Sequence, residues 1–487
     1  MAERRVFDVV VIGGGPAGEN AAAYAVAGGG RTAALVEREL VGGECSYWAC
    51  MPSKALLWPG EVLAQARAMP GVRGLVDGRP LDVSAVLARR DAFTNGHDDS
   101  GQVDWARSAG IEVIRGHGRL VGDRTVEVDR PGGALELHAR EAVVLATGSA
   151  ATVPPVAGLA EALPWTSRDV TNLHEVPERV LVLGGGVVAC ESATWLLALG
   201  VRELTMVVRG ASLLARSEPW AGERVVERLR ELGARILFET ELGSVRREAP
   251  GASGEGWVHG GPATVSLGTA TDAETVTVDE IVVAAGRRPG TADLGLESVG
   301  LTRGRALDTD DHLAVAGVAG GWLYAVGDVN GRAALTHMGK YQGRVCGDVI
   351  AARAAGRALD GPRYTASADR TQTPQVVFTD PQVGSVGLTE QQARANGLAV
   401  ESVSVDIAVA GSALHNDGYR GRAQLVLDGA TDTVVGATFV GPDIAELVHA
   451  ATVAVVGRVP LERLWHAVPS YPTMSEVWLR LLEARRG

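Results

Sequence analysis

Cysteine is scarce in this sequence, and long apolar runs are missing. The 487 residues include only four cysteines, too few for a structural disulfide framework in a chain of this size. No apolar run reaches the length of about 18 residues that a membrane-spanning helix requires. The segment before the first predicted strand lacks the apolar region of a signal peptide. We therefore expect a cytoplasmic protein whose cysteines are reactive, metal-binding or buried in a core.

An excess of positive charge is also missing. Acidic residues outnumber basic ones, 58 to 46, and the formal net charge is −12. Proteins that bind nucleic acid or an anionic membrane surface need grouped lysine and arginine side chains. We therefore expect neither kind of partner. The chain is long enough for roughly two to four domains.

Glycine is abundant, by contrast, and one cluster follows a predicted strand at Val6–Ile12. Gly13, Gly15 and Gly18 have the spacing G-x-G-x-x-G and open an alanine-rich helix, and a second predicted strand ends at Glu37. Such glycines permit a tight turn and the close approach of a pyrophosphate, which the N-terminus of the helix attracts. An acidic residue about twenty positions further on binds ribose hydroxyls. The pattern predicts a dinucleotide-binding site of the Rossmann type.

The same pattern recurs near the middle of the chain. After a predicted strand at 180–183, Gly184 and Gly186 begin a second glycine turn, and the next strand ends without an acidic residue. Arg209 and Arg216 follow that strand instead. An arginine accommodates the 2′-phosphate of NADPH, so the sequence favours NADPH, with NADH still possible. The alternative is that both arginines are solvated surface charges.

Two dinucleotide folds in one chain indicate a flavin that accepts a hydride from a nicotinamide. A strand predicted at 143–150 supports the flavin, since it ends in Thr147 and Gly148. These two residues would make a second close approach to the cofactor bound at the first glycine turn.

A later segment also fits a flavin. A predicted strand ends in Gly327 and Asp328, and a helix is predicted to start near Leu335 and Thr336. We expect Asp328 to hold the ribityl chain. The N-terminus of the helix would lie at the carbonyl edge of the flavin, where reduction builds negative charge.

Two of the cysteines lie close together in the stretch GGECSYWACMPSK, with four residues between Cys45 and Cys50. In a reducing compartment such a pair is catalytic or metal-binding more often than structural. No second Cys/His pair lies at ligand spacing, so we predict no metal site. A helix predicted to start near Pro52 would lower the pKa of nearby thiols. We interpret this pair as redox-active, and Cys190 and Cys346 as core residues.

Together these motifs resemble those of the flavoprotein disulfide reductases. This family of FAD-dependent pyridine nucleotide-disulfide oxidoreductases includes dihydrolipoyl dehydrogenase, glutathione reductase and mercuric reductase. The resemblance covers nearly the whole chain, because the two glycine turns, the cysteine loop and the stretches ATG, AAGRRP, AVGDV and TPQVVFTDPQVGSVGLTE follow in the family's order. It implies FAD, a pyridine nucleotide, a redox-active disulfide and a homodimer.

The resemblance also implies the fold, an α/β protein with two Rossmann-like dinucleotide-binding domains and a C-terminal α+β dimerisation domain. The FAD-binding domain is expected at 1–155 and 290–360, the NAD(P)-binding domain at 156–289, and the dimerisation domain at 365–487. The segment 246–276 is rich in Gly, Ala and Thr. It is predicted to form turns and short strands inside the NAD(P)-binding domain.

The resemblance assigns roles to matching positions. Cys50 corresponds to the flavin-side thiol and Cys45 to the interchange thiol that attacks the substrate, while Lys54 and Glu191 match the ion pair near flavin N5. The candidate flavin-binding residues are Gly13, Gly15, Gly18, Glu37, Gly43, Lys54, Gly118, Thr147, Gly148, Gly327, Asp328, Leu335 and Thr336. The candidate nicotinamide-binding residues are Gly184, Gly186, Val188, Glu191, Arg209, Arg216 and Gly286.

The chain departs from the family pattern near its end. The family carries His-Pro-Thr-x-x-Glu, in which the histidine of the partner subunit is the acid–base group, whereas here Tyr471 precedes Pro472 and Thr473, with Glu476 in register. A phenol with its usual pKa of ~10 is a poorer base at neutral pH than an imidazole near ~6.5. We expect Tyr471 to donate a hydrogen bond or proton and Glu476 to accept from its hydroxyl. His466 is the possible substitute, although we expect it at the surface.

Further departures concern the substrate. Mercuric reductases also place a tyrosine at this point but depend on a C-terminal cysteine pair, and no cysteine follows Cys346 here. Mercury reduction is therefore disfavoured, as is the reduction of large disulfides, which need efficient protonation of the leaving thiolate. Tyr47 and Trp48, between the two cysteines, either narrow the site, offer a stacking platform or replace smaller packing residues.

The predicted function is an NAD(P)H-dependent flavoprotein disulfide oxidoreductase, similar to dihydrolipoyl dehydrogenase. It would pass electrons from NADPH through FAD and the Cys45–Cys50 pair to a small disulfide or another small electrophile. One alternative is a quinone-type oxidoreductase that reduces its acceptor directly from the flavin. Another is a non-catalytic redox sensor that retains FAD.

Overall fold

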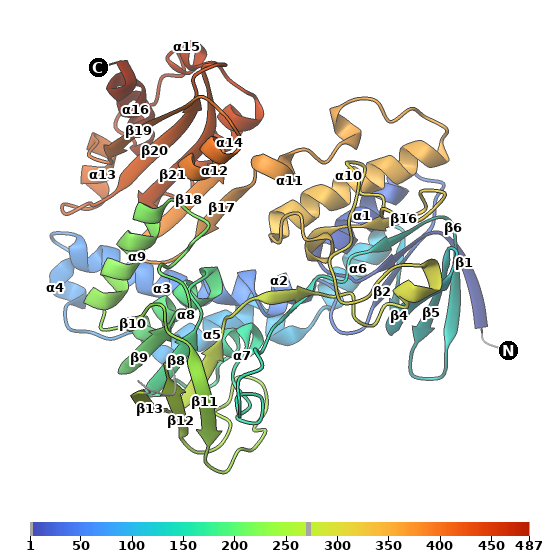
Figure 1. Ribbon diagram of the computed structural model, residues 1–487, viewed down its shortest axis with the longest axis horizontal. Helices are drawn as coiled ribbons and strands as arrows, with labels where there is room; N and C mark the ends of the chain where they lie inside the picture. Colours follow the sequence, from blue (N-terminus) through green and yellow to red (C-terminus); the bar gives the residue numbers. More distant parts are fainter. Residues whose placement is uncertain (1–2, 269–273, 487) are drawn as a thin grey trace. The chain divides into compact units, whose positions relative to one another are not determined.

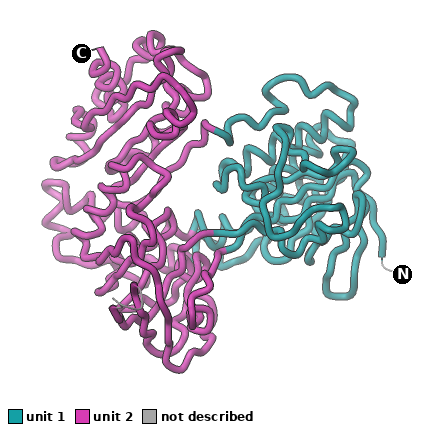
Figure 2. The backbone as a smooth tube through the Cα atoms, viewed as in Figure 1, with its two compact units in different colours: residues 1–51, 91–150, 287–370 teal, residues 52–90, 151–286, 371–487 magenta. Residues whose placement is uncertain are grey.

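The computed structural model describes residues 3–268 and 274–486. Two compact units make up the chain (Figure 1, Figure 2), and the chain passes between them more than once. The first unit comprises residues 1–51, 91–150 and 287–370, and the second comprises residues 52–90, 151–286 and 371–487. Each unit contains hydrophobic clusters of its own, and each is described by itself.

A seven-stranded sheet forms the centre of the first unit. Its strands are β1 (Glu3–Ile12), β2 (Ala33–Glu37), β3 (Ile111–Arg115), β4 (His117–Gly122), β5 (Thr125–Asp129), β6 (Leu135–Leu145) and β16 (Leu323–Ala325). β1 runs parallel to β2 and β6, β2 runs parallel to β3, and the second half of β6 runs parallel to β16. The antiparallel pair β4–β5 continues the sheet from the first half of β6.

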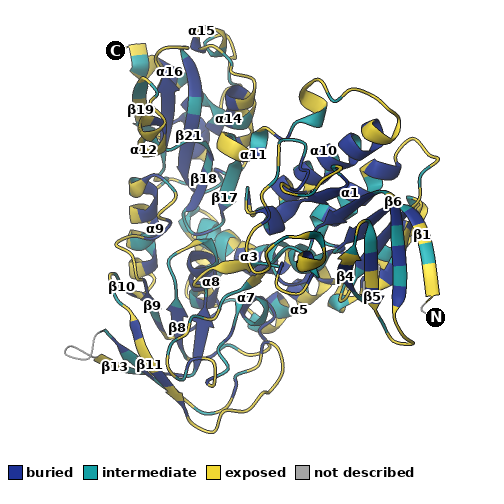
Figure 3. Cartoon of the chain, turned by 45° about the vertical axis from the view of Figure 1, so that its right-hand side comes forward, coloured by how far each residue is buried: buried dark blue, intermediate teal, exposed yellow. Residues whose placement is uncertain are grey.

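Two helices of this unit, α1 (Pro16–Val26) and α10 (Thr336–Ala354), pack closely against each other. Glycines permit this packing: a Cβ at Gly343 would lie 2.4 Å from the carbonyl oxygen of Ala17, and one at Gly347 would lie 2.5 Å from Cβ of Tyr24. Figure 3 shows extensive burial along both helices. Because β1 and β16 both run parallel to β6, the two helices begin at the same edge of the sheet, the edge at which such folds bind ligands.

The remaining helices that lie wholly in the first unit are short. They are α2 (Gly43–Tyr47), α6 (Ser100–Ser108) and the 3-10 turns η1 (Asn95–His97), η2 (Leu296–Val299), η3 (Gly327–Asn330) and η4 (Pro362–Tyr364). Three helices begin in one unit and end in the other: α3 (Cys50–Ala68), α5 (Val83–Phe93) and α11 (Ala368–Thr371). A two-stranded ladder joins β7 (Ser149–Ala151) and β15 (Arg287–Pro289).

The second unit contains three sheets. A parallel sheet has the order β10-β9-β8-β14, formed by β8 (Arg179–Leu183), β9 (Glu203–Val207), β10 (Arg235–Leu237) and β14 (Glu280–Val283). A small antiparallel sheet consists of β11 (Leu242–Arg247), β12 (Ala263–Leu267) and β13 (Glu274–Val278). A five-stranded antiparallel sheet has the order β17-β18-β21-β20-β19, formed by β17 (Pro374–Val377), β18 (Gln382–Gly387), β19 (Val400–Asp406), β20 (Arg422–Asp428) and β21 (Thr433–Gly441).

Helices of the second unit accompany these sheets. With the parallel sheet occur α7 (Ser167–Thr171), α8 (Val187–Ala198) and α9 (Pro219–Glu231). A further short helix of this unit is α4 (Arg73–Val76). With the five-stranded sheet occur α12 (Glu390–Ala395), α13 (Ala410–His415), α14 (Leu447–Val456), α15 (Leu461–Leu464), η5 (Met474–Glu476) and α16 (Val477–Arg486). Apolar side chains of α14 and α16 form one core with this sheet.

The predicted α/β fold class is confirmed, since each unit contains parallel strands followed by helices. The strand predicted at 143–150 ends earlier, at Leu145. The segment 246–276 contains all of β12 and parts of β11 and β13 as short strands, and residues 269–273 lie outside the described residues. In the part of the chain that the structure describes, no helix combines the length and the apolar character needed to cross a membrane.

Candidate active site

The cysteine loop lies in the first unit and contains two free thiols in contact. Cys45 is on α2, and Cys50 is the first residue of α3. A hydrogen bond with the Cys50 thiol, together with burial, raises the pKa of the Cys45 thiol. Sγ of Cys50 also lies 3.1 Å from Oγ1 of Thr336, the first residue of α10. The pair can therefore release one proton far more readily than two, and the N-terminus of α3 favours the thiolate at Cys50.

The two aromatic residues of the loop are packing residues. Tyr47 is 1% exposed and Trp48 is 7% exposed. Their rings contact each other at 5.7 Å between centroids, and each contacts the ring of His97. The hydroxyl of Tyr47 donates to the carbonyl oxygen of Val41, at 3.1 Å. Of the alternatives that the sequence left open, the structure favours packing over a stacking platform, because neither ring is available to a ligand.

The first glycine turn connects β1 to α1 and fits a dinucleotide. Gly13 has φ +105°, and a Cβ there would lie 2.4 Å from the carbonyl oxygen of Ala146. A Cβ at Gly43 would lie 2.9 Å from Cα of Gly15, so the cysteine loop approaches the turn closely. Neither position has room for a side chain, so these glycines allow the close approach of the neighbouring backbone segments. The N-terminus of α1, which follows the turn, favours an anion such as a pyrophosphate.

The carboxylate of Glu37 is fixed at the end of β2. Its Oε2 accepts from the backbone N–H of Gly14 at 2.7 Å, and its Oε1 accepts from that of Glu39 at 2.7 Å. Two carboxylate oxygens offer about four acceptor sites, so this carboxylate can also accept from ribose hydroxyls. Gly118 lies nearby on β4, where a Cβ would lie 3.1 Å from the side chain of Val36.

The turn after β16 holds the second predicted carboxylate. Gly327 has φ +78°, and Asp328 follows it in η3. Oγ of Ser149 donates to Oδ2 of Asp328 at 2.5 Å. Leu335 caps α10, so this helix begins where the sequence predicted. Gly148, next to Ser149, also has a positive φ, of +65°. The residues of the first unit thus fit a flavin dinucleotide.

Lys54 and Glu191 form an ion pair in the second unit. Nζ of Lys54 lies 2.7 Å from Oε2 of Glu191, whose side chain is 5% exposed. Oε1 of Glu191 accepts from the backbone N–H of Phe378 at 2.9 Å, and Nζ of Lys54 lies 4.9 Å from the centroid of the Phe378 ring. A buried carboxylate is costly without a cation and hydrogen bonds, so these contacts fix both side chains.

The second glycine turn connects β8 to α8. Gly184 has φ +134°, and a Cβ there would lie 2.4 Å from the carbonyl oxygen of Ala284. Gly186 caps α8, so the backbone N–H of Val188, in the first turn of that helix, can serve an anion. Arg209 and Arg216 are exposed. Gly286 has φ +130°, and a Cβ built there would have no other atom within 4 Å.

The C-terminal groups do not meet as the sequence predicted. Tyr471 is 78% exposed. Oε2 of Glu476 is buried, and within the described residues it has no hydrogen-bond partner, so it does not accept from the Tyr471 hydroxyl. His466 is exposed, as predicted. A single chain therefore does not assemble a proton-transfer pair at this point.

Sequence reasoning missed several polar residues around these sites. Ser149 holds Asp328, and the side chain of Thr336, where only the backbone was expected to act, touches Cys50. Glu19 on α1 is also unusual, because burial raises its pKa to about 7. None of these has a sequence signal of its own. Among the described residues, no group of three or more His, Cys, Asp or Glu side chains is placed to hold a metal ion.

Comparison with known families covers most of the chain. The family described as "Pyridine nucleotide-disulphide oxidoreductase" matches residues 7–343. The family described as "Pyridine nucleotide-disulphide oxidoreductase, dimerisation domain" matches residues 373–482. Both matches lie in the order that the motifs indicated.

Individual proteins are similar over nearly their whole lengths. Dihydrolipoyl dehydrogenase of Chlamydia muridarum is 29% identical, over 97% of this chain and 95% of that protein. Mercuric reductase of Streptomyces lividans is 31% identical, over 96% and 94%, and glutathione reductase of Burkholderia cepacia is 30% identical, over 98% and 99%. A solved structure, the Cu(II) complex of the HOCl-induced flavoprotein disulfide reductase RclA from Escherichia coli, has a TM-score of 0.81 at 24% identity, over 98% of this chain and 99% of that one. At this identity the likeness to RclA concerns the fold.

Proposed function

Because the chain belongs to the pyridine nucleotide-disulphide oxidoreductases, flavoprotein enzymes that use FAD and a pyridine nucleotide, we propose that it passes electrons from NADPH to a small disulfide or a similar electrophile. The path runs through FAD and the Cys45–Cys50 pair. The observation that carries the proposal is the contact between the two free thiols, with Cys50 held 3.1 Å from Thr336. The reaction belongs in the cytoplasm, where thiols are kept reduced.

The substrate side of the proposed reaction is a thiol–disulfide exchange. The Cys45 thiolate attacks one sulfur of the substrate, so a mixed disulfide forms and the first substrate thiolate leaves and takes up a proton. Cys50 then attacks Cys45, the second substrate thiol leaves, and the Cys45–Cys50 disulfide forms. Two electrons pass from the cysteine pair to the substrate. The hydrogen bond with Cys50 raises the pKa of the Cys45 thiol, so Cys45 must lose its proton as it attacks.

We propose that the first unit holds FAD. When bound, FAD accepts a hydride from the nicotinamide and returns two electrons to the cysteine pair. The N-terminus of α1 would hold the pyrophosphate, Glu37 the adenosine ribose, and Asp328 the ribityl chain. The N-terminus of α10 would supply N–H groups and a partial positive charge at the carbonyl edge. Gly13 and Gly43 let the neighbouring backbone segments pack closely at this site.

Lys54 would stabilise negative charge at the flavin. It lies one helical turn after Cys50 on α3. Its ion pair with the buried Glu191, at 2.7 Å, fixes the ammonium group in position. A positive charge that is held in place needs no reorganisation as the flavin is reduced.

We propose NADPH as the preferred electron donor, bound at the second glycine turn. The residues that support this choice are Arg209 and Arg216, which are exposed near the end of β9. A 2′-phosphate pairs well with a guanidinium group. NADH lacks that phosphate and would bind the same turn more weakly.

A second copy of the chain is the proposed partner. The dimerisation-domain match and the exposed apolar side chains of the second unit support this. The exposed side chains include Val468 (83%), Tyr471 (78%), Leu414 (65%) and Val453 (56%). Apolar side chains so far exposed commonly mark an interface. In the dimer, Tyr471 would serve the cysteine pair of the other subunit, as the family's histidine does.

Replacement of Cys45 by serine tests the function. If Cys45 is the attacking thiol, turnover of a small disulfide such as lipoamide by the Cys45→Ser holoenzyme should fall on the order of a thousandfold or more. Ser46→Ala, on the same helix, should retain turnover. Retained turnover in Cys45→Ser would contradict the proposal and would favour the alternative, a quinone-type oxidoreductase that reduces its acceptor directly from the flavin.

A further inference from the structure

The side-chain amide of Gln342 is buried in the first unit and connects three segments. Gln342 lies on α10 and is 0% exposed. Its Oε1 accepts from the backbone N–H of Gly327 at 2.7 Å and from Nδ2 of Asn330 at 2.9 Å. Its Nε2 donates to Oδ2 of Asp369 at 2.7 Å. A primary amide is costly to bury unless it is hydrogen-bonded, so this position requires a side chain that both accepts and donates.

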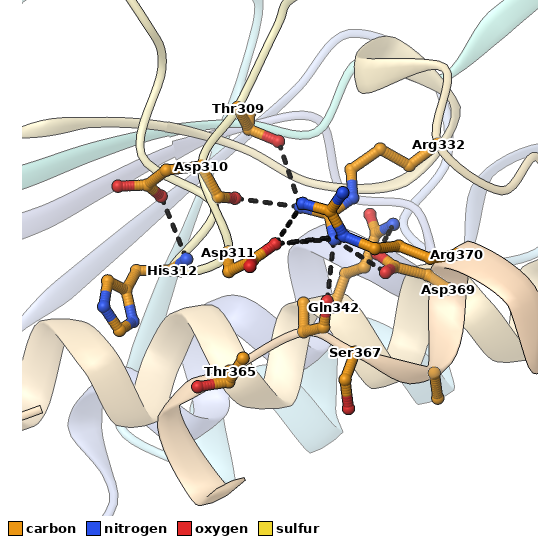
Figure 4. Close-up of polar contacts among 12 residues, drawn as sticks. Thr309, Asp310, Asp311, His312, Arg332, Gln342, Thr365, Ser367, Asp369 and Arg370 are labelled. Carbon is orange, nitrogen blue, oxygen red and sulfur yellow. Dashed lines mark hydrogen bonds and ion pairs between the residues drawn. The ribbon is translucent and has the colours of Figure 1, made fainter. Parts of the chain in front are cut away.

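Asp369 is itself held from its other side. Oδ1 of Asp369 accepts from Nη2 of Arg332 at 2.7 Å, and the Asp369 side chain is 0% exposed. Arg332 also donates to the carbonyl oxygens of Ala366, at 2.7 Å, and Asp310, at 2.8 Å. Figure 4 shows the guanidinium group between these segments. Because Asp369, the acceptor for Nε2 of Gln342, is itself held in place, the amide keeps its Oε1 directed at the backbone N–H of Gly327.

The two groups that donate to Oε1 of Gln342 stand at the two ends of η3. Gly327 begins this turn and Asn330 ends it, and Asn330 also donates to the carbonyl oxygen of Ala325 at 3.0 Å. Asp328 lies between them. Gln342 itself belongs to the helix that starts at Thr336. One side chain thus fixes the turn that carries Asp328 against the helix that carries Thr336.

We propose that Gln342 is a positioning residue for the flavin, which sets where Asp328 and the N-terminus of α10 lie relative to each other. This inference rests on the proposed FAD site. Asp328 and the helix N-terminus would contact different parts of one rigid ligand. The helix-terminal charge acts only within the first turn, so a small displacement of η3 from α10 weakens one of the two contacts.

Gln342→Met tests this inference, because methionine has a similar volume and makes none of these hydrogen bonds. The dissociation constant for FAD should rise about tenfold or more, since the N–H of Gly327 loses its partner. The midpoint potential of the bound flavin should become more negative, because the N-terminus of α10 then stabilises the reduced flavin less. Both quantities are measured on the full chain after release of its flavin and reconstitution with FAD.

Val349→Ala is the matched control. Val349 is fully buried on the same helix in apolar surroundings. Its truncation should lower thermal stability and leave the FAD affinity and the midpoint potential unchanged. If Gln342→Met does not fold, Gln342→Asn, whose amide falls short of Gly327 by one methylene group, should show the same two changes. FAD affinity and potential equal to wild type in the folded variant would overturn the inference, whereas a wild-type chain that binds no FAD would reject the proposed function itself.

Discussion

Tyr471 stands where the family pattern carries a histidine, and it is 78% exposed in the single chain. A phenol ordinarily releases its proton far above neutral pH, whereas an imidazole exchanges a proton near pH 7. Tyr471→His should therefore raise the kcat for a small disulfide at pH 7 by about tenfold or more. Steady-state kinetics of the holoenzyme would show the increase in kcat. An unchanged or lower kcat in Tyr471→His would mean that the site is adapted to another reaction.

The carboxyl group of Glu19 should make the stability of the folded protein depend on pH. Burial raises its pKa from 4.5 to about 7, although the opposite charge of Lys340 opposes this shift. The folded state therefore binds the proton more tightly than the unfolded state does. The stabilisation from this proton is complete below pH 4.5 and is lost as the pH rises through about 7.

Glu19→Gln keeps the neutral form at every pH, so the loss should disappear. At pH 8 the variant should be more stable than wild type, on the order of 1–3 kcal/mol, and at pH 5 the two should be nearly equal. Thermal denaturation of both proteins at the two pH values measures this. The exposed Glu161→Gln should show no such pH-dependent difference. A gain in Tm for Glu19→Gln that is the same at pH 5 and pH 8 would contradict a raised pKa of Glu19.

At the residue level, the sequence predicts residues that belong to a motif with a fixed spacing. It does not predict residues whose partners are distant in the sequence. The spacing of Cys45 and Cys50 and the position of Glu37 after the first glycine turn are enough to predict these residues as site residues. Ser149 could not be found in this way, because its partner Asp328 is 179 residues away. Tyr47 and Trp48 needed the structure as well, since only burial distinguishes packing from substrate contact.

The helices α1 and α10 depend on glycine at their contact. A Cβ at Gly343 would lie 2.4 Å from the carbonyl oxygen of Ala17 and 2.9 Å from Cβ of Asn20. Gly343→Ala should therefore destabilise the protein by about 1–3 kcal/mol. Gly101→Ala, on the exposed side of α6 with open space around it, should be neutral or slightly stabilising. Denaturant titration monitored by circular dichroism compares them, and equal stabilities of the two variants would refute this role of Gly343.

At the element level, strands and helices next to the glycine turns are predictable, because apolar runs and glycine spacing mark both of their ends. Strand β1, α1 and β8 lie where the sequence placed them. The strand predicted at 143–150 ends at Leu145 instead, since apolar character alone does not show where ladder hydrogen bonds stop. Helix α3 begins at Cys50, two residues before the predicted Pro52, which puts the thiol itself in the first turn.

At the scale of the whole molecule, the structure groups the chain into two compact units, and the predicted plan of three domains stays a prediction. The plan separates the residues of the NAD(P)-binding domain from those of the dimerisation domain, whereas both fall within the second compact unit. Long-range contacts such as that between Glu191 and the backbone of Phe378 contribute to this grouping, and no local pattern encodes them. The role predicted for each of the three domains stays a prediction. Sedimentation of the purified protein would show whether two copies associate.

In the proposed function, electrons from NADPH reach a cysteine pair whose Cys50 thiolate lies against the flavin. Anaerobic titration of the holoprotein with NADPH, and separately with NADH, tests it most directly by absorbance. We predict a long-wavelength charge-transfer band from the Cys50 thiolate to FAD, reached with less NADPH than NADH and absent in Cys50→Ser. Bleaching of the flavin without that band would contradict the account.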